Sequence, residues 1–254
     1  MREVLQARID DYAPADALEQ ENVLQELVQH FVLAGLAKAG LFSAAIFHGG
    51  TCLRLFYGTQ RFSEDLDFLL KEPDPDFDWS RYLEQAGKDC TQQGIQFEIQ
   101  DRSKAETAVK QAFMKTDSIG KVLILQLPFG RHRNQKIRIK LEIDSNPPDG
   151  SAFETRFLTF PRPAAVTTQT VQSSFGLKLH ALLCRSYVKG RDWHDLVWYA
   201  SKRIVPELPL LENALIQQGQ WAGTDVQVTP GWLLDAMRRR VEEIDWDVAR
   251  SDVQ

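Results

Sequence analysis

The sequence has few cysteines and no pattern that would use them. Its 254 residues include three cysteines, and no two of these form a CxxC pair. Neither a zinc site nor a disulfide framework is therefore indicated. Cysteine usage of this kind fits a reducing compartment.

Long apolar runs and an excess of positive charge are also absent. The most apolar stretch, residues 31–47, is interrupted by Lys38 and Gly40 and is too short to span a bilayer. The first residues carry no signal-peptide core, so we expect a cytoplasmic protein that does not contact a membrane. The net charge is −5, and binding to a polyanion would therefore have to depend on a local basic patch.

The composition is that of an ordinary globular protein, 43% hydrophobic and 26% charged, but the two halves of the chain differ in pattern. The first half predicts one long helix and several strands, over residues 17–38, 44–47, 65–70, 122–127 and 137–143, the last two as a hairpin. After Pro161 and Pro163 the pattern predicts helices, over residues 171–187, 192–201, 208–218 and 230–249. We therefore expect an α+β protein with an α/β domain over residues 1–163, built on a mixed sheet, and a helical domain over residues 164–254.

A glycine-rich turn follows the predicted strand 44–47. Gly49, Gly50 and Thr51 stand between this strand and a helix expected to begin at Cys52. Two glycines let the backbone come close to a phosphate, and the N-terminal amides of a helix attract anions. The turn is thus a candidate phosphate-binding site.

Carboxylates follow on the next strand. Asp65 and Asp67 are two residues apart and point to the same side of a strand, because side chains alternate between its faces. Glu142, on the second strand of the hairpin, is our candidate for a third carboxylate, and Asp144 is the alternative. Oxygen ligands of this kind hold Mg²⁺ or Mn²⁺ at sites that displace pyrophosphate from a nucleoside triphosphate (NTP). A glycine-rich turn followed by strands that carry these carboxylates therefore predicts a nucleotidyltransferase.

The helical half offers a second group of charged residues. Lys178 and Arg185 are seven residues apart and would lie on one helix face as a cradle for a triphosphate, unless they form only a solvated basic face. Asp192 is predicted to be the N-cap of the following helix. Asp195, three residues later, could orient Lys178 or Arg191, or accept a proton from an acceptor hydroxyl.

The hairpin turn and its second strand are basic. This cluster is a candidate RNA-binding surface, although ordinary solubility would explain it equally well; its residues are Arg131, His132, Arg133, Lys136, Arg138 and Lys140.

Residues 47–54 and 61–68 resemble the first signature of the AbiEii/AbiGii nucleotidyltransferase-like toxins, within the polymerase-β-type superfamily. Residues 178–185 and 190–196 are similar to the second signature of that family. The resemblance implies a toxin of a toxin–antitoxin or phage-defence pair, with an antitoxin as partner. Two positions depart from the family pattern: His48 replaces a common lysine, and Glu142 replaces a common aspartate.

The resemblance also implies roles for individual residues. It assigns Gly49, Gly50 and Thr51 to the phosphates, Asp65 and Asp67 to the metal, and Lys178 and Asp195 to activity. Arg61, Ser63 and Arg185 are further candidates for binding the nucleotide.

Three hypotheses about function follow. The leading one is magnesium-dependent transfer of a nucleoside monophosphate (NMP) from NTP to RNA, with the 3′ end of tRNA as the expected acceptor, since some relatives modify it. The alternatives are transfer to a protein or a small molecule, and a nucleotide-binding module without catalysis.

Overall fold

The computed structural model describes residues 2–101, 118–126 and 136–251. The chain divides into two compact units, and each is described here by itself. The first comprises Met1–Asn146 and Thr155–Thr168, and the second comprises Pro147–Glu154 and Gln169–Gln254. The predicted boundary between residues 163 and 164 stays a prediction.

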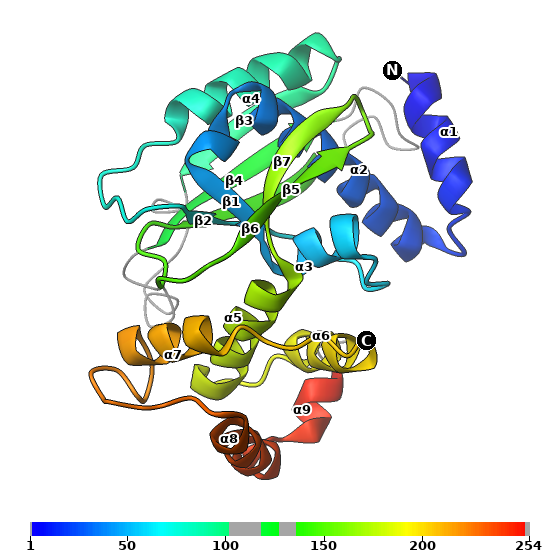
Figure 1. The fold of residues 1–254 in the computed structure, drawn as a ribbon. Coiled ribbons are helices and arrows are strands. Elements are labelled where there is room, and N and C mark those ends of the chain that lie inside the picture. Colours follow the sequence, from blue (N-terminus) through cyan, green and yellow to red (C-terminus); the bar gives the residue numbers. More distant parts are fainter. Residues whose placement is uncertain (1, 102–117, 127–135, 252–254) are drawn as a thin grey trace. The chain divides into compact units, whose positions relative to one another are not determined.

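Within the described residues, seven strands form one mixed sheet in the order β3-β4-β5-β2-β1-β7-β6 (Figure 1). Strands β2 and β5 are parallel, as are β1 and β7, whereas β1/β2, β3/β4 and β4/β5 are antiparallel. The predicted mixed sheet and the β4–β5 hairpin are confirmed. The strand bounds are β1 Ala45–His48, β2 Leu66–Leu70, β3 Gln96–Asp101, β4 Ser118–Gln126, β5 Lys136–Asp144, β6 Phe153–Leu158 and β7 Ala164–Gln169.

The longest helix of the first unit begins and ends where the sequence predicts. Asp16 caps helix α2 (Ala17–Lys38), because its side chain accepts a hydrogen bond from the backbone amide of Glu19 at 2.8 Å. Gly40 then adopts a φ of 83°, which ends the helical course. The other helical segments of this unit are α1 Arg2–Tyr12, η1 Leu41–Ser43, α3 Gly49–Cys52, the π-helical turn η2 Leu53–Tyr57 and α4 Ser80–Gln92.

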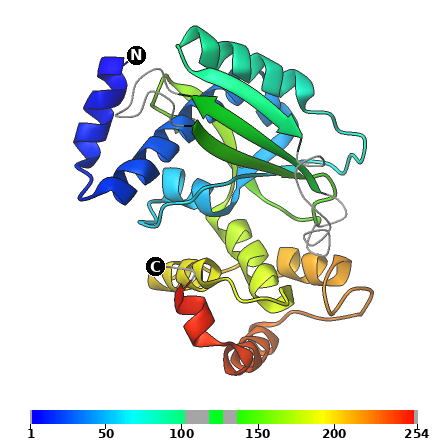
Figure 2. The ribbon, with the colours of Figure 1, turned by 180° about the vertical axis from the view of Figure 1, so that it is seen from behind.

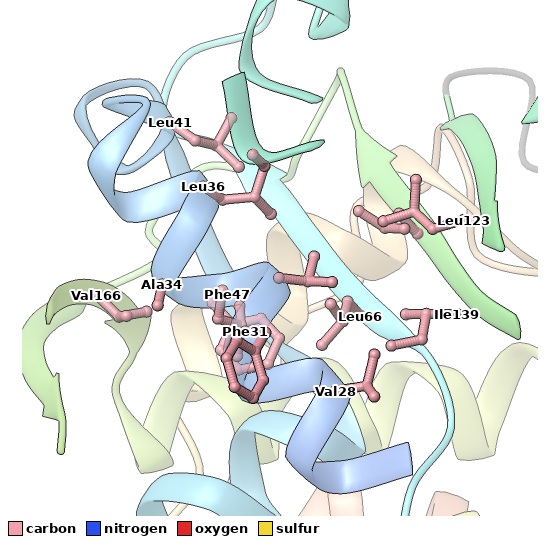
Figure 3. Packing of buried hydrophobic residues seen from close by; sticks show 14 of the residues in the cluster. Val28, Phe31, Ala34, Leu36, Leu41, Phe47, Leu66, Leu123, Ile139 and Val166 are labelled. Atoms are coloured by element: carbon pink, nitrogen blue, oxygen red, sulfur yellow. The ribbon is translucent and has the colours of Figure 1, made fainter. Parts of the chain in front are cut away.

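The core of the first unit lies between helices α2 and α4 and the sheet. Helix α2 packs against α4 and β5, and α4 packs against β3. Figure 3 shows Phe31 of α2, Phe47 of β1 and Leu66 of β2 packed together, and all three are fully buried. Burial of each such side chain contributes roughly 2 kcal/mol, so the strands that carry the candidate site residues rest on a rigid apolar layer.

The second unit is helical (Figures 1 and 2). Its helices are α5 Val171–Cys184, α6 Gly190–Ser201, α7 Leu208–Gln217, α8 Pro230–Glu243 and α9 Trp246–Ser251. Helix α5 contacts α6, α7 and α8, and the ring of Phe175 stacks on that of Tyr199 of α6 with centroids 4.4 Å apart. Two predictions were wrong here: α5 ends at residue 184 instead of 187, and the single helix expected over residues 230–249 is two helices.

Candidate functional site

The turn after β1 brings the backbone of Gly49 against the carboxylate of Asp67. Gly49 has a φ of 80°, a conformation that L side chains rarely adopt. A Cβ added to Gly49 would lie 2.5 Å from Oδ2 of Asp67. His48 and Asp67 are Cα partners on the antiparallel strands β1 and β2, which explains this approach. Only glycine fits this position.

The second glycine lies beside two other predicted site residues. A Cβ on Gly50 would lie 2.8 Å from a terminal guanidinium nitrogen of Arg61 and 2.9 Å from the hydroxyl oxygen of Ser63. The structure therefore brings Gly49, Gly50, Arg61 and Ser63 together at one end of β1. The helix was predicted to begin at Cys52. It begins at Gly49, so this prediction was wrong and both glycines belong to the first helical turn.

Thr51 is held inside this turn. Its side chain is fully buried, and its hydroxyl donates a hydrogen bond to the backbone carbonyl of Asp65. The backbone amide of Thr51 lies in the first turn of α3, where amides have no partner within the helix. The hydroxyl of Thr51 thus fixes the residue that precedes β2, and Thr51 itself is fully buried beside the partly exposed Gly49 and Gly50.

Two carboxylates stand on neighbouring parallel strands. Asp67 of β2 and Glu142 of β5 are Cα partners, and paired strands lie about 4.8 Å apart. Leu66 and Leu141, their neighbours in sequence, are fully buried, so Asp67 and Glu142 point to the opposite face. Asp65 immediately precedes β2.

The alternative third carboxylate has a different environment. Glu142 forms an ion pair with Lys140 at 3.0 Å, and each of these side chains is about a third exposed. Asp144 is 8% exposed, and its Oδ1 accepts a hydrogen bond from the backbone amide of Asn146 at 3.1 Å. Glu142 is thus the more accessible carboxylate, and Asp144 stabilises the end of β5.

The donor chemistry of this face suits a hard divalent cation. Carboxylate oxygens are the side-chain ligands that magnesium prefers, and glycine backbone beside them leaves room for phosphates. Across residues 2–101, 118–126 and 136–251, no three histidine, cysteine, aspartate or glutamate side chains converge closely enough to hold a metal ion. Asp67 and Glu142 are brought onto paired positions, whereas Asp65 does not join them as a third converging carboxylate. Phosphate and water oxygens normally complete a magnesium site, so the chemistry of two carboxylates is compatible with a partial set.

In the second unit, Lys178 lies between two buried carboxylates. Its ammonium is 2.7 Å from Oδ1 of Asp192 and 3.0 Å from Oδ2 of Asp195. Asp192 is 4% exposed and Asp195 is fully buried. The prediction that Asp195 could orient Lys178 agrees with this contact.

The charged side chains in this cluster shift one another's pKa values. Burial by itself would lower the pKa of Lys178, but the carboxylates of Asp192 and Asp195 outweigh burial and raise it. Burial would likewise raise the pKa of Asp192, but Lys178 and Arg185 outweigh it and lower the value. Both partners therefore stay charged in the folded protein.

Asp192 is the residue whose role the sequence misassigned. The N-cap of α6 is Lys189, and Asp192 lies in the first turn, with its carboxylate bound to Lys178 and Arg185. Arg185 is the C-cap of α5 and has extended backbone angles. The amide of Arg185 still donates to the carbonyl of Ala181, and the side chains of Lys178 and Arg185 reach the same carboxylate, which agrees with the expectation that they lie on one helix face.

The candidate RNA-binding surface lies partly within the described residues. Arg131, His132 and Arg133 fall outside them. On β5, Ile137, Ile139 and Leu141 are buried, whereas the exposed Arg138 alternates with them on the face that carries Lys140 and Glu142. Arg138 and Lys140 therefore share a sheet face with Glu142.

No helix in the described part of the chain is both long enough and apolar enough to cross a membrane.

Comparison with known proteins places the two sequence signatures, in residues 47–68 and 178–196, in one family. The model of the nucleotidyltransferase AbiEii toxin family, a type IV toxin–antitoxin system, matches residues 31–254. No curated protein matches the chain. Two Helicobacter pylori crystal structures are similar to it. One is described as a candidate nucleotidyltransferase. It is 18% identical to this chain with a TM-score of 0.48, and the match covers 90% of this chain and 92% of that chain. The other is JHP933, which is 17% identical with a TM-score of 0.47, and the match covers 91% of this chain and 88% of that chain.

The family model covers both signatures and most of the chain, and it confirms the resemblance that the motifs indicated. Membership implies an NTP substrate and an antitoxin partner. The chain therefore belongs to the AbiEii family of nucleotidyltransferase toxins.

Proposed function

We propose that this nucleotidyltransferase transfers an NMP group from NTP to RNA, with the 3′ end of tRNA as the acceptor, and releases pyrophosphate. The contact between Gly49 and the carboxylate of Asp67 carries the proposal. It places backbone that can approach a phosphate directly against a carboxylate that can hold a cation. Glu142, on the neighbouring strand, supplies a second carboxylate on the same face.

Each predicted site residue of the first unit has a role in this proposal. The backbone of Gly49, Gly50 and Thr51 binds the phosphates, helped by Arg61 and Ser63 beside Gly50. Asp65, Asp67 and Glu142 hold Mg²⁺, for which Mn²⁺ can substitute. A cation bound there would neutralise the charge that develops on the leaving pyrophosphate.

The reaction exchanges one phosphoanhydride bond for one phosphodiester bond. The acceptor hydroxyl oxygen attacks the α-phosphorus, the bond to the oxygen bridging the α- and β-phosphorus atoms breaks, and pyrophosphate leaves with its electron pair. The hydroxyl proton passes to a base or to solvent. Positioning and charge stabilisation account for most catalysis in such a displacement.

The charged cluster of the second unit is assigned to the same reaction. Arg185, whose side chain is about a third exposed, offers a planar guanidinium for an anionic phosphate, and Lys178 orders the cluster from between Asp192 and Asp195. Asp195 holds the ammonium of Lys178 in place from a fully buried position. We assign Lys178 and Asp195 to activity and Arg185 to nucleotide binding.

RNA is the preferred acceptor because of the charge on β5. Arg138 and Lys140 lie on the face that carries Glu142, and lysine and arginine contacts to phosphates dominate affinity for nucleic acids. The biological setting that we propose is growth arrest in the cytoplasm, as part of phage defence, under control of a cognate antitoxin.

A labelling assay tests the proposal. Protein, Mg²⁺, total tRNA and each α-labelled NTP in turn should yield labelled RNA with wild type and none with Asp67→Asn. Labelled protein or a labelled small product from cell extract would replace RNA as the acceptor. Absence of label in RNA, protein and small molecules with every NTP would contradict the proposal.

A further inference from the structure

The segment from Thr59 to Asp65 is held by side chains of helix α2. Nε2 of Gln29 donates hydrogen bonds to the backbone carbonyls of Ser63 at 2.8 Å and Glu64 at 3.0 Å. Gln29 is 1% exposed. A buried amide that donates to two successive carbonyls restrains the path of the backbone. The carbonyl of Glu64 also accepts a hydrogen bond from Nε2 of Gln25 of the same helix at 3.3 Å.

A buried carboxylate on the same helix holds the other end of the segment through Arg54. Glu26 is 5% exposed, and it accepts hydrogen bonds from Nε of Arg54 at 2.7 Å and from the hydroxyl of Tyr12 at 2.5 Å. The other side of the Arg54 guanidinium donates to the backbone carbonyls of Thr59 at 3.3 Å and Gln60 at 2.7 Å. Glu26 thus orients the guanidinium of Arg54, which binds the backbone at Thr59 and Gln60.

This segment carries residues that the proposed function uses. Arg61 and Ser63 lie beside Gly50, and the carbonyl of Asp65 accepts a hydrogen bond from the hydroxyl of Thr51. After the amide of Thr59, which donates to the carbonyl of Leu53 at 3.3 Å, the segment belongs to no helix or strand as far as Asp65. Its conformation therefore depends on the side chains that contact it.

We propose that Glu26 and Gln29 are positioning residues that hold Arg61 and Ser63 in place to bind the phosphates of the NTP. This inference rests on the proposed function. Both residues precede residue 31, where the match to the family model begins. The part of the chain before the family match thus completes the nucleotide site of the first unit.

A purely structural role makes a different prediction from a positioning role. If Glu26 and Gln29 only stabilise α2, their loss lowers the folded fraction and the apparent kcat but leaves the KM for every substrate unchanged. If they position Arg61 and Ser63, the KM for NTP rises while the KM for the RNA acceptor does not change.

The variants Gln29→Ala, Gln29→Glu and Glu26→Gln of the full chain separate these roles. Gln29→Glu keeps the size of the side chain but turns a donor into a carboxylate that faces two carbonyls. Lys38→Ala is the matched control, because it removes an ion pair of the same helix, at 2.7 Å to Asp89. Two measurements are made on each variant: amide hydrogen exchange of the free protein, and the KM for NTP and for RNA separately.

For Gln29→Ala we expect exchange in peptides covering residues 59–65 to accelerate about tenfold, and the KM for NTP to rise by a similar factor. Gln29→Glu should have a larger effect on both, and Lys38→Ala should have none on either. Exchange in residues 59–65 that matches wild type would overturn the inference, as would an unchanged KM for NTP. Should wild type transfer no label, the proposed function fails, and exchange still decides whether α2 holds the segment.

Discussion

Asp67 and Glu142 are Cα partners across the parallel strands β2 and β5, although 75 positions (142 − 67) separate them in the chain. Both point away from the buried core, because Leu66 and Leu141 occupy the opposite face. The sheet thus brings together two carboxylates that no local motif connects. The register makes Glu142, rather than Asp144, the partner of Asp67.

The choice between the two carboxylates of β5 is open to a direct test. We predict that Glu142→Gln lowers kcat/KM about a hundredfold, because it removes a charged ligand for the cation. Asp144→Asn should lower it less than about threefold, and should lower stability by about 1 kcal/mol through its bond to Asn146. Kinetics and urea unfolding of both variants provide the measurement, and the reverse order of activities would make Asp144 the ligand.

The contact between Gly49 and Asp67 predicts an unequal effect of two alanine substitutions. Gly40 and Gly49 have φ values of 83° and 80°, but only Gly49 has atoms in the way of a Cβ. Gly40→Ala should cost about 1 kcal/mol in stability, from backbone strain alone, and leave activity intact. Gly49→Ala should cost more than this and abolish transfer, since it displaces the carboxylate of Asp67. Equal activity in the two folded variants would refute the contact.

Lys178 and Asp195 should be coupled in stability. Removal of one partner leaves a buried charge with fewer compensating contacts, so Lys178→Met and Asp195→Asn should each lower the free energy of unfolding by about 3 kcal/mol. The double variant should lose less than the sum, with a coupling of about 1–3 kcal/mol. Urea unfolding of the four proteins gives this value, and strict additivity would argue against the ion pair.

The same cluster predicts a pH range of stability. The pKa of Asp192 is lowered in the folded state, so its contribution is present above about pH 4 and is lost as the pH falls below this value. The pKa of Lys178 is raised, so its contribution is present below about pH 10 and is lost as the pH rises through the folded value. Asp192→Asn should therefore flatten the fall in unfolding free energy between about pH 4 and pH 2. A slope identical to that of wild type would show that Asp192 is not held as a charged group.

Elements with strong local signals were predictable. Helix α2 has the predicted bounds because Asp16 caps it, apolar residues recur along it and Gly40 follows it. The carboxylate face was also predictable, since alternation along β2 and β5 places Asp67 and Glu142 opposite the buried residues. The pairing of β2 with β5 could be found only from the structure, because neither sequence segment shows with which distant strand, or in which register, it pairs.

Long-range contacts explain the errors. Asp192 has the sequence context of an N-cap, but Lys178 and Arg185 bind its carboxylate, and this competing interaction comes from α5. The break between α8 and α9 carried a local signal that was missed: Asp245 accepts hydrogen bonds from the amides of Asp247 and Val248 and so caps α9. Strand β6 was missed because prolines flank it at positions 147–148 and 161–163, and β7 was missed because it directly follows Pro163, where only helices were expected. Helix α1 was not predicted either.

Calorimetric titration of NTP into wild type and Asp67→Asn, each with Mg²⁺ and with EDTA, tests the central claim most directly. If Asp67 holds a cation against phosphates bound at Gly49 and Gly50, wild type should bind NTP at least about tenfold more tightly with Mg²⁺ than with EDTA, and Asp67→Asn should lose this difference. Equal affinity in wild type with and without Mg²⁺, unchanged by Asp67→Asn, would contradict the account.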